Sequence, residues 1–303
     1  MEGLHNIWKI LSQPDNVPIV IMLITTFGYS ALALRKARQN DRNGIFEATQ
    51  ADKVQVWPYL VKVEFLMTIG IMIILTVWSI TVNAPLEEAA NPTLTPNPSK
   101  APWYFLGLQE MLVYFDPWIA GVMLPVFIIV GLICIPYIDI NPKGNGYYTL
   151  KERPFAVATF SIGFLILWCS LIELGTFMRG PGWYFFWPWQ YWDVHRVVAL
   201  TNMDFFEAFG IPSKNVDGSF NITQVILGGI LVCGYLIAFP MWVWKKWKTK
   251  SPVLKEMGPI RYGISIALFL MMLGLPIKMF LRLAFNIKYL WVFGIGHDAF
   301  FNI

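Results

Sequence analysis

The apolar residues of this chain are gathered into blocks of about 20, and this arrangement limits what it can fold into more than any other feature. A helix of that length crosses the hydrocarbon core of a bilayer. Only 14% of the 303 residues are charged, against roughly a quarter in a soluble domain. We therefore predict an all-α, polytopic membrane helix bundle of about six transmembrane helices, at residues 17–34, 60–83, 117–138, 154–177, 222–244 and 262–284.

The connections between these blocks alternate in basic content. The first holds Arg35, Lys36, Arg38, Arg42 and Lys53, the third holds Lys143, Lys151 and Arg153, and the fifth, residues 245–261, is the most basic. The second connection, residues 83–116, has Lys100 as its one basic residue, and the fourth is sparsely basic. Because basic loops tend to remain in the cytoplasm, we expect an integral protein of the bacterial cytoplasmic membrane with both termini on the outer, positive side.

The second connection has an unusual composition for a loop between two spans. Residues 91–112 contain four prolines, a Trp-Tyr-Phe run and Glu110. Each proline fixes its own φ and disfavours helix at the residue before it. Backbone that lacks regular hydrogen bonds must pack on protein or line a cavity at membrane depth. A stiff aromatic cavity at the outer interface suits a lipid-soluble ring compound.

Residues 103–115 are expected to form a short interfacial helix before the third span. Trp103 and Glu110 are seven positions apart, so they differ by only about 20° around the helix axis. A carboxylate beside an aromatic wall is a plausible proton acceptor, which makes Glu110 a candidate. A water-exposed loop acid is the alternative.

Other chemistry-bearing residues give weaker signals. His5, His195 and His297 lie outside the spans or at their edges, whereas haem ligands in a bundle project inward from the helices. The cysteines, Cys134, Cys169 and Cys233, lie within apolar blocks without a CxxC or CxxCH motif, so we expect no metal site.

The acids and aromatic residues near the ends of the spans can each be interpreted in two ways. Glu64, Glu173 and Asp139 are functional candidates as acids close to the membrane, or structural residues that reach water. The fourth connection carries eight aromatic residues within 183–192, which is typical of an interfacial aromatic belt. A docking surface for a partner protein is the alternative.

The second connection resembles the C-terminal half of cytochrome b, and the separate subunit IV of bf-type complexes. That family carries E-P-A-N-P, two residues, T-P, four residues, then P-E-W-Y. At the matching spacing this chain has Glu88, Ala89, Ala90, Asn91 and Pro92, then Thr95 and Pro96, then Ala101, Pro102, Trp103 and Tyr104. Downstream, Arg153 and Pro154 match the R-P pair that begins the family's next helix. The resemblance covers residues 57–180.

The resemblance implies a quinol-oxidising pocket on the positive side of the membrane, lined by Pro102, Trp103, Tyr104 and Phe105. In the family, the motif Glu takes a proton from quinol while electrons divide between an iron–sulfur protein and haem b. Here Pro102 replaces that Glu, and Val113 stands where the family has Arg. Glu110 is therefore our hypothesis for the proton acceptor.

The resemblance also implies a membrane subunit of a quinol:cytochrome c oxidoreductase, which would not be an enzyme alone. Its cofactor would be quinone, with haem b and the iron–sulfur cluster in partner subunits. Those partners are a haem-binding N-terminal-type cytochrome b chain, a Rieske-type protein and a c-type cytochrome, in a dimeric complex with lipid. We expect no nucleic-acid partner. An assembly subunit without a working quinol site, and an unrelated transporter, are the alternatives.

Three segments are expected along the chain. Residues 1–56 would supply an extra transmembrane helix and a basic cytoplasmic loop, and residues 57–180 the subunit IV-like domain. Residues 181–303 would supply the aromatic interfacial loop, further transmembrane helices and a C-terminal tail.

Overall fold

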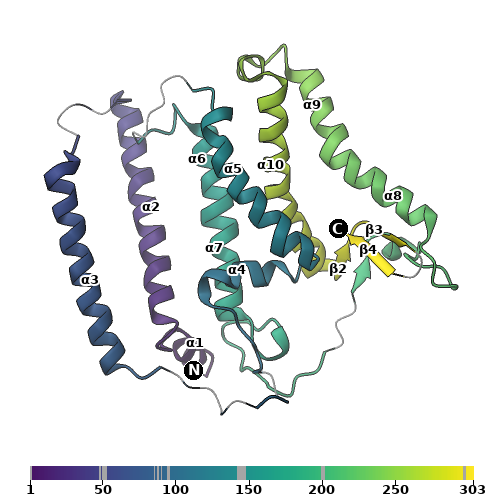
Figure 1. The fold of residues 1–303 in the computed structure, drawn as a ribbon, viewed down its shortest axis with the longest axis horizontal. Coiled ribbons are helices and arrows are strands. Elements are labelled where there is room, and N and C mark those ends of the chain that lie inside the picture. Colours follow the sequence, from purple (N-terminus) through teal and green to yellow (C-terminus); the bar gives the residue numbers. More distant parts are fainter. Residues whose placement is uncertain are drawn as a thin grey trace. The chain divides into compact units, whose positions relative to one another are not determined.

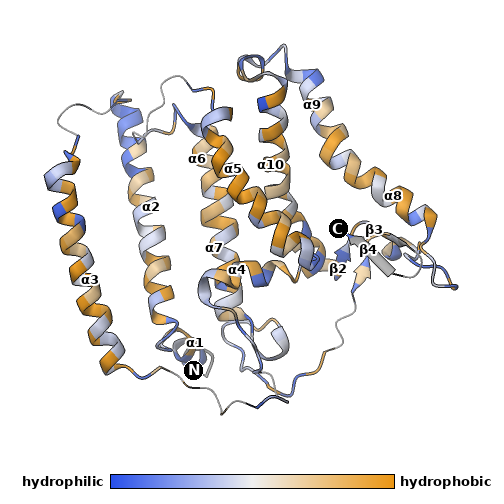
Figure 2. Ribbon diagram, viewed as in Figure 1, coloured by the Kyte–Doolittle hydropathy of each residue, from blue (hydrophilic) through white to orange (hydrophobic). Residues whose placement is uncertain are grey.

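The computed structural model is mainly helical, and it describes residues 2–47, 49, 53–84, 86, 89, 91–93, 96–141, 148–198, 202–295 and 298–303 (Figure 1). Within them, six helices are long and apolar enough to cross a membrane: Val17–Asn43, Val56–Thr81, Ile119–Ile138, Pro154–Met178, Ile222–Trp247 and Pro252–Phe285. Colouring by hydropathy shows apolar residues along most of these helices, whereas Val17–Asn43 is mixed and ends in hydrophilic residues (Figure 2). The predicted polytopic helix bundle is confirmed.

Several spans comprise consecutive helical segments. In chain order, the elements are α1 (Glu2–Leu11), α2 (Val17–Asn43), η2 (Val56–Leu60), α3 (Val61–Thr81), α4 (Trp103–Met111), η3 (Ile119–Met123), α5 (Leu124–Ile138), α6 (Pro154–Phe160), η4 (Ser161–Trp168), α7 (Cys169–Glu173), η5 (Leu174–Met178), η6 (Pro181–Trp183), β1 (Met203–Asp204), η7 (Glu207–Phe209), α8 (Ile222–Cys233), η8 (Gly234–Ala238), α9 (Phe239–Trp247), α10 (Pro252–Phe285), β2 (Ile287–Tyr289), β3 (Val292–Ile295) and β4 (Asp298–Asn302).

The first helix extends well beyond its apolar block. Residues 35–43, expected in the first connection, form the last turns of α2. Arg, Lys, Gln and Ala are good helix formers, so the helix continues past the apolar block. It ends at Gly44, whose φ of 67° is left-handed and whose N–H donates to the carbonyl of Asn40.

The short helix before the third span is confirmed but ends earlier than residue 115. Within α4 the chain is helical to Met111, after which Leu112, Val113 and Tyr114 donate to carbonyls three residues back. Such bonds tighten the last turn of a helix. Pro117 follows, and it disfavours helix at the residue before it.

The chain divides into two compact units, each described here by itself. The first contains Met1–Trp103 and Lys143–Arg196. Its buried cluster joins Ile19 and Leu23 of α2 to Cys169 and Ile172 of α7, with Trp168 and Phe177 packed against them. Van der Waals packing of this kind is what holds helices together in lipid.

The connections of the first unit join at two places. Near the N-terminus, the Asn6 amide donates to the carbonyls of Pro188 (3.2 Å) and Gln190 (2.6 Å). At the other end of α2, the Asp41 carboxylate accepts from the backbone N–H groups of Leu150 (3.0 Å) and Lys151 (3.2 Å). The N-terminal segment therefore meets the fourth connection, while the first connection meets the third.

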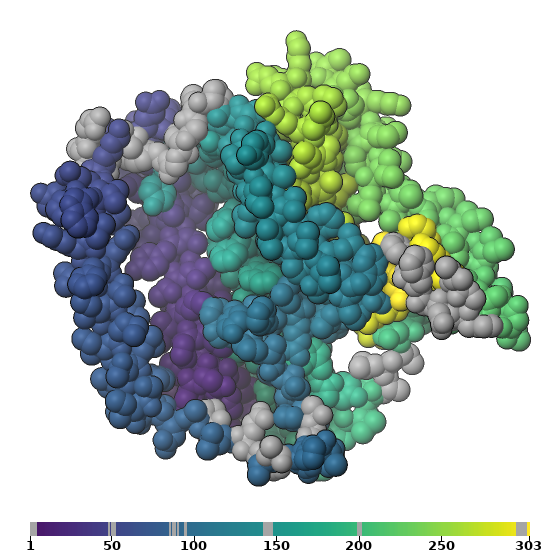
Figure 3. Space-filling view, in the orientation of Figure 1, coloured from purple at the N-terminus to yellow at the C-terminus, as the bar shows by residue number. Residues whose placement is uncertain are grey.

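Helix α3 is the exception within this unit because it buries none of its residues. Its side chains are exposed nearly all round, although its mean hydropathy is that of a membrane span. In the space-filling view α3 stands clear of α2 along much of its length (Figure 3). A helix that is apolar all round has to be covered by lipid or by another protein chain.

The second unit contains Tyr104–Pro142 and Val197–Ile303. The Tyr235 hydroxyl donates to the carbonyl of Leu270 (2.7 Å), and that of Tyr262 donates to the carbonyl of Pro240 (2.8 Å). These bonds tie the span of α8 and α9 to α10. Helix α5 also packs on α10, where Gly131 lies against Leu268.

The C-terminal segment forms short strands that the sequence did not predict. Strand β2 pairs in parallel with β1, and β3 pairs antiparallel with β4. The indole of Trp291 lies on Gly228 of α8, where a Cβ atom would come within 2.5 Å of the ring. Glycine thus allows the C-terminal segment to pack closely on the fifth span.

Candidate functional site

The described part of the second connection packs on protein. The Asn91 side chain accepts from the backbone N–H (3.0 Å) and hydroxyl (2.7 Å) of Thr93, which forms a turn at Pro92. Further along, the Asn97 side-chain oxygen accepts a hydrogen bond from the backbone N–H of Gly182. The connection is therefore held against the fourth connection, as irregular backbone near a membrane requires.

Lys100 makes the second attachment between these connections. Its Nζ donates to the backbone carbonyl of Thr176 at 2.7 Å and lies 4.9 Å from the centre of the Trp192 ring. Burial lowers the pKa of Lys100 to about 8, although the Asp15 carboxylate acts in the opposite direction. The sequence alone indicates only a positive charge at this position.

The aromatic fourth connection has a buried and an exposed part. Phe186 is buried against Gly180, with the Arg196 guanidinium 5.0 Å from its ring centre. Trp187 and Trp189 stack on each other with centroids 5.2 Å apart, and both are largely exposed. The exposed indoles suit an interfacial belt and a docking surface equally, so both predictions stay open.

The four residues predicted to line the quinol pocket lie at the start of α4. Pro102 is exposed, and the side chains of Trp103, Tyr104 and Phe105 are 40%, 52% and 51% exposed. The rings of Tyr104 and Phe105 are 4.7 Å apart and tilted by 56°. Trp103 belongs to the first unit and Tyr104 to the second. Their role in quinol binding stays a prediction.

Glu110 lies near the end of α4 and is fully buried. The Tyr114 hydroxyl, which is also buried, donates to its Oε1 at 2.7 Å. Glu110 is thus not a water-exposed loop acid. Trp103, two turns earlier on the predicted face, remains partly exposed, so a shared face does not give the two residues the same environment. A buried carboxyl group with a hydroxyl donor can hold a proton if one is delivered to it.

The remaining motif residues have structural positions. Arg153 is the N-cap of α6, and its carbonyl accepts from Val157 N–H at 3.0 Å. Pro154 follows as the first helical residue, where its fixed φ fits and no N–H is needed. Asn91 and Pro96 are exposed. Glu88 and Thr95 lie outside the described residues.

The histidines are not brought together. His5 and His195 are exposed, and His297 lies outside the described residues. Within the described ranges, no group of three or more His, Cys, Asp or Glu side chains could hold a metal ion.

The three acids near the span ends stand apart from one another. Glu64 lies exposed in the first turn of α3, and Glu173 is half-buried at the end of α7. The carboxylate of Asp139 accepts from the backbone N–H of Asn141 (3.0 Å) just after α5. Asp139 therefore has a local structural role at the end of that span.

Sequence reasoning missed a buried cation in the last span. Lys278 of α10 is almost fully buried, its Nζ donates to the carbonyl of Lys288, and it lies 5.5 Å from the centre of the Phe115 ring. A lysine within a membrane span is costly and therefore notable. Lys278 lies inside the predicted span 262–284, so the sequence alone could have indicated a lysine at membrane depth.

Asp116 forms the centre of a second polar contact in the same unit. Its Oδ2 accepts from the Tyr289 hydroxyl (3.3 Å) and from the Asn302 amide (3.1 Å). Burial and the neighbouring Asp116 carboxylate raise the pKa of Tyr289 to about 12. Asp116 thus ties the C-terminal segment to the residues that follow α4.

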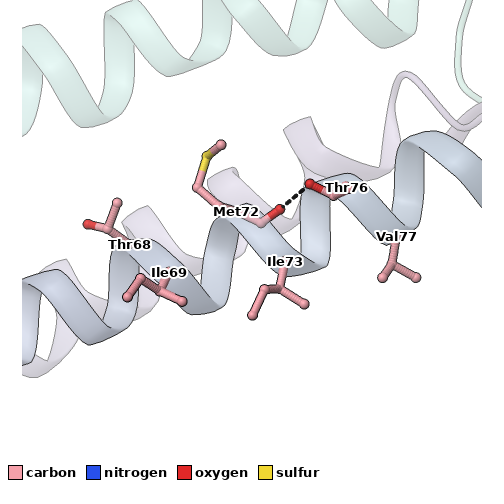
Figure 4. Close-up of a pocket in the computed structure, with 6 residues that line it drawn as sticks. All are labelled: Thr68, Ile69, Met72, Ile73, Thr76 and Val77. Carbon is pink, nitrogen blue, oxygen red and sulfur yellow. Dashed lines mark hydrogen bonds between the residues drawn. The ribbon is translucent and has the colours of Figure 1, made fainter.

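Two surface grooves lie on other elements. One, of about 340 Å³, is lined by Thr68, Ile69, Met72, Ile73, Thr76 and Val77, all of α3 (Figure 4). In it the Thr76 hydroxyl donates to the carbonyl of Met72 at 2.7 Å, so its one donor is used within the helix. The other, of about 390 Å³, lies between the start of α8 and β3. Neither contains a residue predicted to bind quinol.

The comparison with protein families matches the motif-bearing segment. Residues 89–177 match the family described as cytochrome b(C-terminal)/b6/petD. No solved structure matches the chain. The matched residues include the second connection, α4, the third span and nearly all of the fourth, and they fall within the predicted range 57–180. Residues 89–177 are therefore similar to the C-terminal part of cytochrome b, with its b6 and petD relatives.

Proposed function

We propose that this chain is a membrane subunit of a quinol:cytochrome c oxidoreductase, in which Pro102, Trp103, Tyr104 and Phe105 contribute to the pocket where quinol is oxidised. The observation that carries the proposal is the family match, which runs through these residues and through Glu110. Family members are subunits of bc- and b6f-type complexes.

The residues at the start of α4 suit a quinol ring chemically. Trp103 and Phe105 offer apolar ring faces, and the Tyr104 hydroxyl can donate to or accept from a quinol oxygen. The side chains of Trp103, Tyr104 and Phe105 each keep 40–52% of their surface exposed, which a ligand or a partner subunit could cover.

Oxidation of one quinol to quinone releases two electrons and two protons. We propose that the Glu110 carboxylate accepts one of these protons, assisted by the Tyr114 hydroxyl, which donates to it. The electrons pass to metal centres in partner chains. Glu110 then returns its proton toward the positive side of the membrane.

The metal centres of such a complex would belong to other chains. A haem-carrying cytochrome b chain, a Rieske-type iron–sulfur protein and a c-type cytochrome are the proposed partners. The exposed α3 gives a membrane surface for a partner chain or lipid. The helices outside residues 57–180 are proposed to bind subunits peculiar to this complex.

Contacts within the first unit support the proposed sidedness. The N-terminal segment meets the fourth connection through Asn6, while the basic first and third connections meet through Asp41. The contact between the basic first and third connections agrees with basic loops that lie on one side of the membrane. From the alternating basic content of the connections we propose a bacterial cytoplasmic membrane with both termini and α4 on the positive side.

A second candidate is an assembly subunit that no longer oxidises quinol. Pro102 favours it, because a proline side chain can neither accept a proton nor form a hydrogen bond. Under this alternative, removing the carboxyl group of Glu110 would leave quinol oxidation by the complex unchanged.

The test is to purify the intact complex and measure quinol-dependent reduction of cytochrome c, together with its haem spectrum. The Glu110→Gln variant keeps the size of the side chain but loses the acid. We expect kcat to fall by about 10²-fold or more, in the range of general acid–base contributions. The exposed Glu256→Gln serves as the control and should retain full activity. Full activity of Glu110→Gln across pH would remove Glu110 from the mechanism, and a complex without haem b would contradict the proposal.

A further inference from the structure

Lys100 lies two residues before Pro102 and attaches the second connection to other residues of the first unit. Its Nζ has two contacts within the first unit, the Thr176 carbonyl (2.7 Å) and the Trp192 ring (4.9 Å). Asn97, three residues earlier, accepts from the N–H of Gly182. Two attachments within four residues fix both the position and the direction of the chain.

The Thr176 carbonyl is a suitable acceptor for a cation. Thr176 lies in η5 (Leu174–Met178), which is the last turn of the fourth span. The last carbonyls of a helix have no partner within the helix, and the partial negative charge there favours a cation. The Trp192 ring face adds a second favourable contact with the ammonium group.

We propose that Lys100 is a positioning residue of the quinol site. By binding the end of the fourth span it holds Pro102 and Trp103, the next residues along the chain, in the arrangement that admits quinol. This inference rests on the proposed function. Only Ala101 separates Lys100 from Pro102, so we expect loss of this attachment to shift Pro102 and Trp103 from that arrangement.

The expected effect is on substrate binding. If the binding-competent arrangement is only a fraction of the population, the apparent dissociation constant rises by the inverse of that fraction. Chemistry in the molecules that do bind stays the same. A structural defect of the whole subunit would instead lower the amount of assembled complex or kcat.

The first measurement uses the intact complex with Lys100→Met, which keeps the aliphatic stem and loses the amine. We expect the KM for quinol to rise about tenfold, from the loss of one charged hydrogen bond and one cation–π contact, with kcat within twofold. Lys100→Arg keeps a cation and donors to the carbonyl and should restore KM to within about threefold of the unsubstituted complex. Lys9→Met, at an exposed lysine of α1, is the matched control and should leave KM unchanged.

The second measurement is amide hydrogen exchange of the same complexes, which does not depend on activity. The N–H groups of Ala101 and Trp103 should exchange faster in Lys100→Met than in the unsubstituted or Lys9→Met complex. An unchanged KM in Lys100→Met, or unchanged exchange at both amides, overturns the role of Lys100. If the unsubstituted complex does not oxidise quinol, the proposed function itself fails, and exchange alone then decides whether Lys100 fixes the chain.

Discussion

At the residue scale, the burial of Glu110 distinguishes a candidate proton acceptor from a water-exposed loop acid. The family's acidic position is occupied by Pro102, so no carboxylate remains there. Eight residues later, Glu110 is buried and accepts a hydrogen bond from Tyr114. A buried acid requires partners because an isolated charge is poorly solvated in a protein interior. The side chain is therefore held in one place, as a proton acceptor needs to be.

Replacing Tyr114 by Phe removes the hydroxyl that donates to Glu110 and keeps the aromatic ring. The variant should be destabilised by about 1–3 kcal/mol, the usual cost of leaving a buried acceptor without its donor. Thermal unfolding of the purified complex would measure this loss. Replacing the exposed Tyr191 by Phe is the control and should change stability by less than about 0.5 kcal/mol. Equal stability of the two variants would show that the Tyr114 hydroxyl does not support Glu110.

The lowered pKa of Lys100 predicts a dependence on pH with a definite sign. Burial lowers the pKa of Lys100 from 10.5 to about 8. Between pH 8 and pH 10.5, Lys100 is therefore protonated to a smaller extent when it is attached to Thr176 than when it is detached. The lowered pKa means that the cost of desolvating the ammonium exceeds what its contacts with the Thr176 carbonyl and the Trp192 ring return. The neutral amine keeps a hydrogen-bond donor without that cost, so attachment strengthens by at most about 3 kcal/mol as the pH rises through this window and is weaker and constant below it. Protection of Ala101 N–H, measured by hydrogen exchange relative to Lys100→Arg, should increase between pH 8 and 10. If the exchange rate of Ala101 N–H relative to Lys100→Arg stayed constant between pH 8 and 10, the lowered pKa of Lys100 would be contradicted.

The sequence indicated candidate site residues but not their surroundings. Motif spacing identified Pro102, Trp103 and Tyr104 because those residues are adjacent in the chain. The partners of Lys100 are more than 70 residues away, and no local pattern indicates such contacts. Lys278 could have been found, since it lies inside a predicted span, but its burial against Phe115 depends on how distant segments pack.

At the scale of elements, hydropathy predicted the existence of every span, while the limits of the helices depended on other properties. Helix α2 continues to Asn43 because its basic residues are good helix formers. Gly258, with φ of 72°, interrupts α10 before the membrane-spanning part begins. The strands after α10 are short and depend on pairing with distant residues, so no periodic pattern in the sequence announces them.

The packing of Trp291 on α8 gives a prediction at this scale. A Cβ atom at Gly228 would come within 2.5 Å of the Trp291 ring. Gly228→Ala should therefore destabilise the protein by about 1–3 kcal/mol through overpacking. Gly234→Ala, in the same span but with no atom within 4 Å, is the matched control. Unfolding in detergent would compare them, and equal stability of the two variants would contradict close packing of Trp291 on the helix.

At the scale of the whole molecule, the chain is a set of membrane spans whose apolar surface exceeds what it buries itself. Helix α3 buries nothing, and less than a quarter of each other span is buried. Such a chain needs lipid or other subunits to cover the remainder. This requirement agrees with a subunit of a larger membrane complex.

The sidedness of the chain can be tested by cysteine labelling in a variant without native cysteines. Cysteines at Gln13 and Val216 should react with an impermeant maleimide in right-side-out vesicles, because these residues lie in connections expected outside. Cysteines at Arg42 and Lys250 should react only after the membrane is permeabilised. All four positions are exposed. The reverse pattern would place α4 on the cytoplasmic side and exclude quinol oxidation at the positive side.

The central claim is that the start of α4 contacts quinol, and photoaffinity labelling of the intact complex with an azidoquinone tests it most directly. We predict that the label attaches to the peptide containing residues 102–105, and that excess quinol prevents the reaction. A complex that oxidises quinol but carries the competed label only on other peptides or other subunits would contradict the account.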